Sequence, residues 1–142
     1  MQHKQQDANK EASLNLARTI ARLAYDKKAL DIQAVDVREL VSYADYFIVC
    51  SGLNEPQVKG IHGRILEELR KQDIDPITVE GDDFNRWVLM DYNAVIVHIL
   101  IEPLRGLYEL ERLWGDAETI DLELPDEPAY FDDDDDLSWD DD

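Results

Sequence analysis

The segment Ala94–Ile101 constrains the fold more than any other part of the chain. Seven of its eight residues are apolar, and His98 is the exception. Because apolar residues occupy both alternating sets of positions, both faces of this strand should be buried. A preceding apolar run, Trp87–Met90, is separated from it by Asp91–Asn93, residues that favour or tolerate a turn. The two runs therefore predict a β-hairpin whose second strand is covered on both faces.

A helix is expected directly after this strand. Glu102 and Pro103 should open it, because the missing N–H of proline has no helical partner in a first turn anyway. Gly115 should end it, since glycine adopts a left-handed cap at little cost. Apolar and aromatic residues recur between these ends at helical spacing: Leu104, Leu107, Tyr108 and Trp114.

Hydrophobic spacing and turn residues predict the remaining elements. One helix should run from Ser13, as its N-cap, to about Lys28, and another over 55–72, where Asn54 and Gln57 form a capping box. Short strands are predicted over 32–37, 46–50 and 77–80. The resulting order predicts an α/β domain with a mixed five-stranded sheet packed with helices.

Charge divides the chain into parts. The net charge is −19, and residues 126–142 hold ten acidic residues and no basic one, leaving 14 basic against 23 acidic residues, or −9, for the rest. Ordering a residue costs about 1–2 kcal/mol of backbone entropy, which the few apolar side chains of this end cannot offset. We therefore expect a flexible N-terminus (1–12), a folded domain (13–124) and an acidic disordered tail (125–142).

The acidic balance also limits the partners. A negatively charged protein repels phosphate backbones, so direct DNA or RNA binding is disfavoured and a basic protein partner is favoured. The acidic tail, which carries spaced aromatic residues, either stays solvated or docks on such a partner. No segment approaches 18 consecutive apolar residues, and the N-terminus has no secretory pattern. A cytoplasmic protein without membrane contact is expected.

The sequence shows no strong catalytic or metal-binding pattern. Its six glycines are scattered, and neither Cys-x-x-Cys nor His-x-x-x-His occurs, so no cofactor and no metal are predicted. The single cysteine, Cys50, is expected to be a small buried hydrophobe, not a nucleophile. Asp36, Asp45 and Asp91 lie near strand ends, where carboxylates can hold Mg²⁺, although capping of turns is the commoner role.

Aromatic residues are unusually frequent in one third of the chain. Trp87, Tyr92, Tyr108 and Trp114 cannot all be core residues of so small a domain. Aromatic side chains left at the surface are common interface anchors, each worth about 2 kcal/mol or more when central. The alternative is that the tryptophans merely cover the edge of the sheet.

Five motifs, in their order and spacing, resemble the ribosomal silencing factor family, RsfS, also called the Iojap family. They are ADYFIVCSG (Ala44–Gly52), VEG (Val79–Gly81), RWVLMDY (Arg86–Tyr92), VIVHI (Val95–Ile99) and LYELERLWGDA (Leu107–Ala117). The likeness runs from about Ser13 to Ala117, and the acidic extension after Pro125 lies outside it.

The resemblance implies a translational repressor that is not an enzyme. Members of the family bind the fourteenth protein of the large ribosomal subunit and sterically block joining of the small and large subunits, chiefly in starvation. They are similar in fold to nucleotidyltransferases without the catalytic residues, and they tend to form homodimers when free. In agreement, Ser51-Gly52 follows its strand here, whereas a nucleotidyltransferase places Gly-Ser ahead of a strand with Asp-x-Asp.

The expected contact surface combines the hairpin and the last helix. Its residues are Trp87, Asp91, Tyr92, Tyr108, Glu111 and Trp114. Asp91 and Glu111 would pair with Arg or Lys of the ribosomal protein, and the aromatic rings would supply buried area. Two alternatives remain: a factor for assembly of the large subunit, and a metal-dependent nucleotidyltransferase that uses Asp45 and Asp91.

Overall fold

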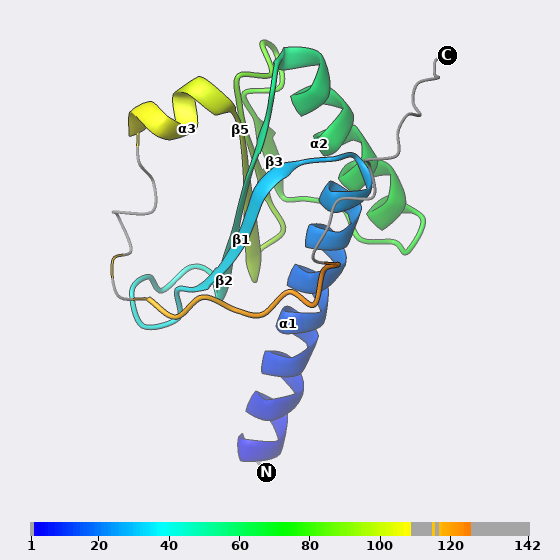
Figure 1. Cartoon of the computed structure of the whole chain (residues 1–142). Coiled ribbons are helices and arrows are strands. Elements are labelled where there is room, and N and C mark those ends of the chain that lie inside the picture. The colour runs from blue at the N-terminus through cyan, green and yellow to red at the C-terminus, as the bar shows by residue number, and fades with distance from the viewer. Residues whose placement is uncertain (1, 109–114, 116, 126–142) are drawn as a thin grey trace.

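A five-stranded mixed sheet forms the centre of the molecule, with helices on both of its faces (Figure 1). The computed structural model describes residues 2–108, 115 and 117–125. The helices are α1 (Gln2–Asp26), α2 (Glu55–Arg70) and α3 (Glu102–Tyr108). The strands are β1 (Leu30–Asp36), β2 (Tyr46–Gly52), β3 (Thr78–Glu80), β4 (Trp87–Asp91) and β5 (Val95–Ile101). The predicted fold class and order of elements are confirmed.

Strand β5 lies at the centre of the sheet, whose order is β1-β2-β5-β4-β3. It pairs parallel with β2 and antiparallel with β4, and the β4–β5 pair is the predicted hairpin. Every residue of β5 except His98 is buried, as its continuous apolar sequence requires.

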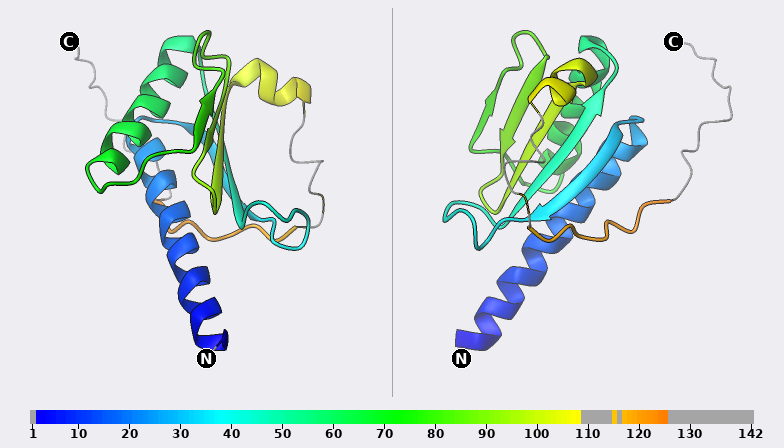
Figure 2. Two further views of the ribbon diagram at one scale, coloured as in Figure 1. Left: turned by 180° about the vertical axis from the view of Figure 1, so that it is seen from behind. Right: turned by 60° about the vertical axis from the view of Figure 1, so that its left-hand side comes forward.

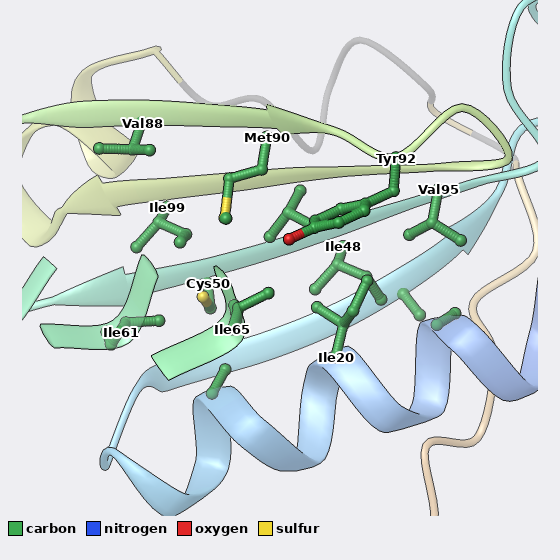
Figure 3. Packing of buried hydrophobic residues seen from close by; sticks show 14 of the residues in the cluster. Ile20, Ile48, Cys50, Ile61, Ile65, Val88, Met90, Tyr92, Val95 and Ile99 are labelled. Carbon is green, nitrogen blue, oxygen red and sulfur yellow. The ribbon is translucent and has the colours of Figure 1, made fainter. Parts of the chain in front are cut away.

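Helices α1 and α2 pack together on one face of the sheet (Figure 2). The core between them and the strands includes Ile20, Ile61, Ile65 and Met90, each with 0% exposure (Figure 3). Cys50 belongs to the same core, and burial raises the pKa of its thiol to about 12. A thiol held neutral in this way is a poor nucleophile, in line with the hydrophobic role predicted for it.

Helix α1 begins at Gln2, so the predicted start at Ser13 is wrong. Residues 2–12 contain no glycine or proline and are rich in Gln, Lys, Glu and Ala, which are good helix formers. Ser13 therefore lies within the helix, where its Oγ donates a hydrogen bond to Asp45 Oδ2 at 2.7 Å. The N-terminal half of α1 projects beyond the sheet (Figures 1 and 2).

The start of α2 follows the sequence expectation. Asn54 caps the helix, and its Oδ1 accepts the Gln57 N–H at 2.9 Å. The Gln57 side chain reaches back one residue further than a capping box requires, since its Oε1 accepts the Leu53 N–H at 2.7 Å.

Residues 117–125, which we name the strap, lie along the body of the domain. Thr119 forms a bridge with Val35, and the Ile120 N–H donates to the Ala34 carbonyl at 2.9 Å. The strap then crosses to α1, where the Arg18 guanidinium donates two hydrogen bonds to the Asp121 carbonyl. The strap therefore covers part of the outer edge of β1 and joins it to α1.

Candidate functional site

The sheet face that carries α3 is less covered than the face under α1 and α2. Strand alternation and register place the following side chains on it: Gln33, Val35, Phe47, Val49, Ser51, Thr78, Glu80, Trp87, Leu89, Asp91, Ile96, His98 and Leu100. We name this set the α3 face. Leu104 of the short helix packs at one end of it, and Phe47, Trp87, Leu89 and His98 are only half-buried.

Three rings form a row across neighbouring strands of the α3 face. The Trp87 indole Nε1–H donates a hydrogen bond to His98 Nδ1 at 3.3 Å, and the two ring centroids are 6.3 Å apart. On the other side, the Phe47 ring meets His98 edge-on at 5.4 Å between centroids. Such edge-on aromatic pairs contribute about 0.5–1.5 kcal/mol beyond the area that they bury.

His98 carries no charge at neutral pH. Burial lowers the pKa of its imidazole to about 4, because a protonated ring would lose its hydration. The hydrogen bond from Trp87 also needs an unprotonated Nδ1 as its acceptor. The centre of the α3 face is therefore apolar and aromatic, without a positive charge.

The charged side chains of this face are both acidic. Glu80 and Asp91 lie on its β3–β4 side, and none of the sheet residues that make up the α3 face is a lysine or arginine. Asp91 Oδ1 accepts the Asn93 N–H at 2.8 Å, which fixes the carboxylate where the hairpin turns. Asp91 forms no ion pair with any described residue, so its charge is open to a partner.

Arg105 holds α3 at the other end of the face. Its side chain is buried, and Nη1 donates to the Asp31 carbonyl at 2.6 Å and to Ser51 Oγ at 3.1 Å. Hydrogen bonds from a charged donor contribute about 1.5–3 kcal/mol, so this arginine ties the short helix to the ends of β1 and β2. The chain leaves α3 towards residues 109–114 from this fixed position.

Comparison with known proteins identifies the family. The family model described as "Ribosomal silencing factor during starvation" matches residues 10–139. The chain belongs to the ribosomal silencing factor family. The sequence resemblance is thereby confirmed, and the match extends past Ala117, the expected end of the likeness, into the acidic extension after Pro125, which was expected to lie outside it.

Individual known proteins are also similar to this chain in sequence or structure. The ribosomal silencing factor of Bacillus subtilis is 40% identical over 99 residues, which cover 70% of this chain and 84% of that protein. A crystal structure of a Chromobacterium violaceum protein has a TM-score of 0.69 at 27% identity, covering 78% of this chain and 92% of that one. A mouse protein named "Mitochondrial assembly of ribosomal large subunit protein 1" is 28% identical over 98 residues, which cover 67% of this chain and 43% of that protein.

The structure separates the residues expected to form the family's contact surface. Trp87 and Asp91 share the α3 face, whereas Tyr92 belongs to the core on the opposite side (Figure 3). Tyr92 is 6% exposed, so the expectation that its ring lies at the surface is wrong. The Tyr92 side chain points to the same face of the sheet as those of Val88 and Met90, because side chains two residues apart in a strand share a face.

The last helix is described only in part. Tyr108 is the final residue of α3, and its side chain lies outside the described part of the structure. Glu111 and Trp114 lie outside the described residues as well. Phe47, Leu89 and His98 were not predicted as members of this surface. Leu89 could have been, because it lies two positions from Trp87 in the same strand, and His98 could have been, because it is the one polar residue in an apolar strand.

The carboxylates considered for Mg²⁺ are held by three different neighbours. Asp36 pairs with Arg38, Asp45 accepts the Ser13 hydroxyl, and Asp91 caps its own turn. Among the described residues no cluster of three or more His, Cys, Asp or Glu side chains could hold a metal ion.

In the same part of the chain, no helix is both long and apolar enough to span a membrane.

Proposed function

We propose that this chain represses translation by binding the large ribosomal subunit through its fourteenth ribosomal protein. Bound there, it would sterically block joining of the small and large subunits, chiefly in starvation. The observation that carries the proposal is the α3 face, which combines an aromatic centre with two carboxylates and lacks lysine and arginine among its sheet residues. Obstruction of this kind requires a tight, well-placed contact and no catalytic group.

The chemistry of the face fits a basic protein. Proteins that bind RNA neutralise phosphates with lysine and arginine, so a ribosomal protein offers positive charge beside apolar contact area. Complementary charge raises the association rate and excludes other partners, while half-buried aromatic side chains supply the binding energy. The body of this chain, at −9 without its last seventeen residues, adds to the attraction.

Each contact residue has a proposed role. Asp91 pairs with a lysine or arginine of the ribosomal protein, and the exposed side of Trp87 packs against its apolar surface. Tyr108, the last residue of α3, together with Glu111 and Trp114, which follow it in the sequence, extends the contact. Tyr92 supports the hairpin from within the core and makes no direct contact.

Co-sedimentation with isolated large subunits tests the proposal. The parent chain should sediment with large subunits and reduce the fraction that joins added small subunits. Asp91→Lys and Trp87→Ala should each weaken binding about tenfold or more, as expected for central interface residues. Glu67→Lys is the matched control, because it makes the same charge change on the exposed side of α2. Equal binding of Asp91→Lys and parent chains would reject this surface.

A role in assembly of the large subunit is the second candidate. It is favoured by the printed name of the mouse relative, which refers to ribosomal large subunit assembly. Both roles need the same docking site, so binding alone does not separate them. Sucrose gradients of cells lacking the protein do: loss of an assembly factor raises large-subunit precursors, whereas loss of a silencing factor raises joined ribosomes in starved cells.

When free, the chain is proposed to be a cytoplasmic homodimer. Burial of apolar area on the α3 face by a second copy would lower its exposure to water. Sedimentation equilibrium of the parent chain and of Trp87→Ala tests this; a monomeric parent chain would overturn it.

A further inference from the structure

The segment between β1 and β2 presents two large apolar side chains to solvent. We name residues 37–45 the β1–β2 link; Leu40 is 53% exposed and Tyr43 is 61% exposed. Single exposed apolar residues are ordinary, but these two lie on the same short segment of the chain.

Tyr43 continues the aromatic row of the α3 face. Its ring centroid lies 6.4 Å from that of Phe47, which in turn contacts His98. The row therefore runs without interruption from the link, through β2 and β5, to Trp87 on β4. The link and the α3 face form one continuous surface.

Backbone hydrogen bonds hold the link in place. The Val37 N–H donates to the Asp45 carbonyl at 2.9 Å, and the N–H groups of Leu40 and Val41 both donate to the Val37 carbonyl at 2.9 Å. The Asp45 N–H donates to the Ala94 carbonyl at 2.7 Å, which ties the link to the β4–β5 turn. Side chains presented from such an ordered segment lose little further freedom on binding.

The link has a negative charge, as the α3 face does. The Arg38 guanidinium, the sole basic group of the link, is bound by the carboxylate of Asp36, so it offers little free positive charge. Glu39 is exposed and Asp45 is half-buried, which leaves the surroundings of Tyr43 negative. This surface favours a partner with arginine or lysine side chains beside apolar groups.

We propose that Leu40 and Tyr43 form a second anchor for the basic large-subunit protein that the α3 face binds. The inference rests on the proposed function and extends it to the β1–β2 link. A partner arginine or lysine lies over the Tyr43 ring, where cation–π attraction and nearby carboxylates act together. Leu40 adds apolar contact area beside it.

Binding of full-length variants to isolated large subunits tests the second anchor. The double variant Leu40→Ser, Tyr43→Ala should bind about tenfold or more weakly than the parent chain, whereas Tyr43→Phe should bind within about twofold of it. Phe84→Ala is the matched control, since Phe84 is 77% exposed on the β3–β4 loop. That loop lies at the opposite end of β4 from the turn that the link contacts.

Urea unfolding checks that each variant is folded; the expected free energies of unfolding are unchanged, because the replaced side chains are exposed. If Asp91→Lys binds weakly but the double variant binds like the parent chain, the second anchor is overturned and the proposed function stands. If the double variant loses only self-association, the link is a contact between copies and the inference is again overturned. A parent chain that does not bind large subunits overturns both.

Discussion

Trp87 and His98 are joined by a hydrogen bond across the β4–β5 pair, from the indole Nε1–H to the imidazole Nδ1 at 3.3 Å. The bond exists only while His98 is unprotonated, and burial lowers the pKa of this imidazole to about 4. The geometry of the proposed contact surface is thus linked to the protonation state of one histidine.

Acidification should destabilise the fold through His98. The unfolded chain takes up a proton near pH 6.5, whereas the folded chain does so only near pH 4. Stability contributed by His98 is therefore complete above pH 6.5 and falls as the pH drops towards 4, by about 3 kcal/mol. Urea unfolding near pH 7 and pH 5 measures the loss.

His98→Gln provides the comparison for that measurement. Glutamine keeps a hydrogen-bond acceptor for Trp87 and does not titrate, so the variant should lose less stability between the two pH values. His62, whose pKa burial also lowers, is replaced by glutamine in both proteins. Equal pH dependence in the two proteins would show that His98 titrates normally in the folded state.

Tyr92→Phe should leave the protein at least as stable as the parent chain. The Tyr92 hydroxyl is buried and has no hydrogen-bond partner among the described residues, and burial raises its pKa to about 12. Removing an unsatisfied buried group relieves a desolvation cost of about 1–3 kcal/mol. Thermal unfolding measures the change. Weaker large-subunit binding by Tyr92→Phe would instead assign the hydroxyl to the contact surface.

The misplacement of Tyr92 shows where sequence reasoning failed. Two apolar runs and a turn predict the hairpin. The alternation of side chains along each strand also predicts which face of the sheet each residue occupies. Trp87 and Asp91 are separated by an even number of positions and share a face, whereas Tyr92 is an odd number away from Trp87. Grouping them as aromatic surface residues ignored the alternation of the strand, which was available from the sequence.

Other features depended on contacts that a sequence does not display. Phe47 and His98 lie on strands that are parallel and distant along the chain, so their contact follows from a register that only the fold defines. The buried position of Arg105 needs carbonyl and hydroxyl acceptors from β1 and β2. The early start of α1 was missed because residues 2–12 have helix-forming residues but no apolar stripe.

Gly81→Ala should destabilise the fold by about 3 kcal/mol or more. Gly81 has a φ of +84°, and a Cβ atom there would lie 2.0 Å from the Trp87 carbonyl oxygen. Both the left-handed backbone and the backbone clash oppose a side chain. Because the clash falls on Trp87, large-subunit binding should weaken as well. Chemical denaturation and co-sedimentation provide the two measurements.

Gly63→Ala is the matched control for this substitution. Gly63 lies within α2, and a Cβ atom there would meet nothing within 4 Å. Alanine in a helix interior is favoured over glycine by about 0.5–1 kcal/mol, so this variant should be more stable than the parent chain. Similar stability changes for the two variants would contradict the close approach at Gly81.

The strap should contribute to stability, whereas the acidic segment after it should not. A chain ending at Leu124 keeps Ile120 and Leu122, which pack against the core, and should unfold within about 0.5 kcal/mol of the parent chain. A chain ending at Ala117 loses both side chains and the hydrogen bonds to β1, and should be less stable by about 3 kcal/mol. The difference between the two truncations isolates the strap, because both lack the acidic segment that follows it. Equal unfolding free energies for the two truncated chains would mean that the contacts of the strap with β1 and the core do not stabilise the fold.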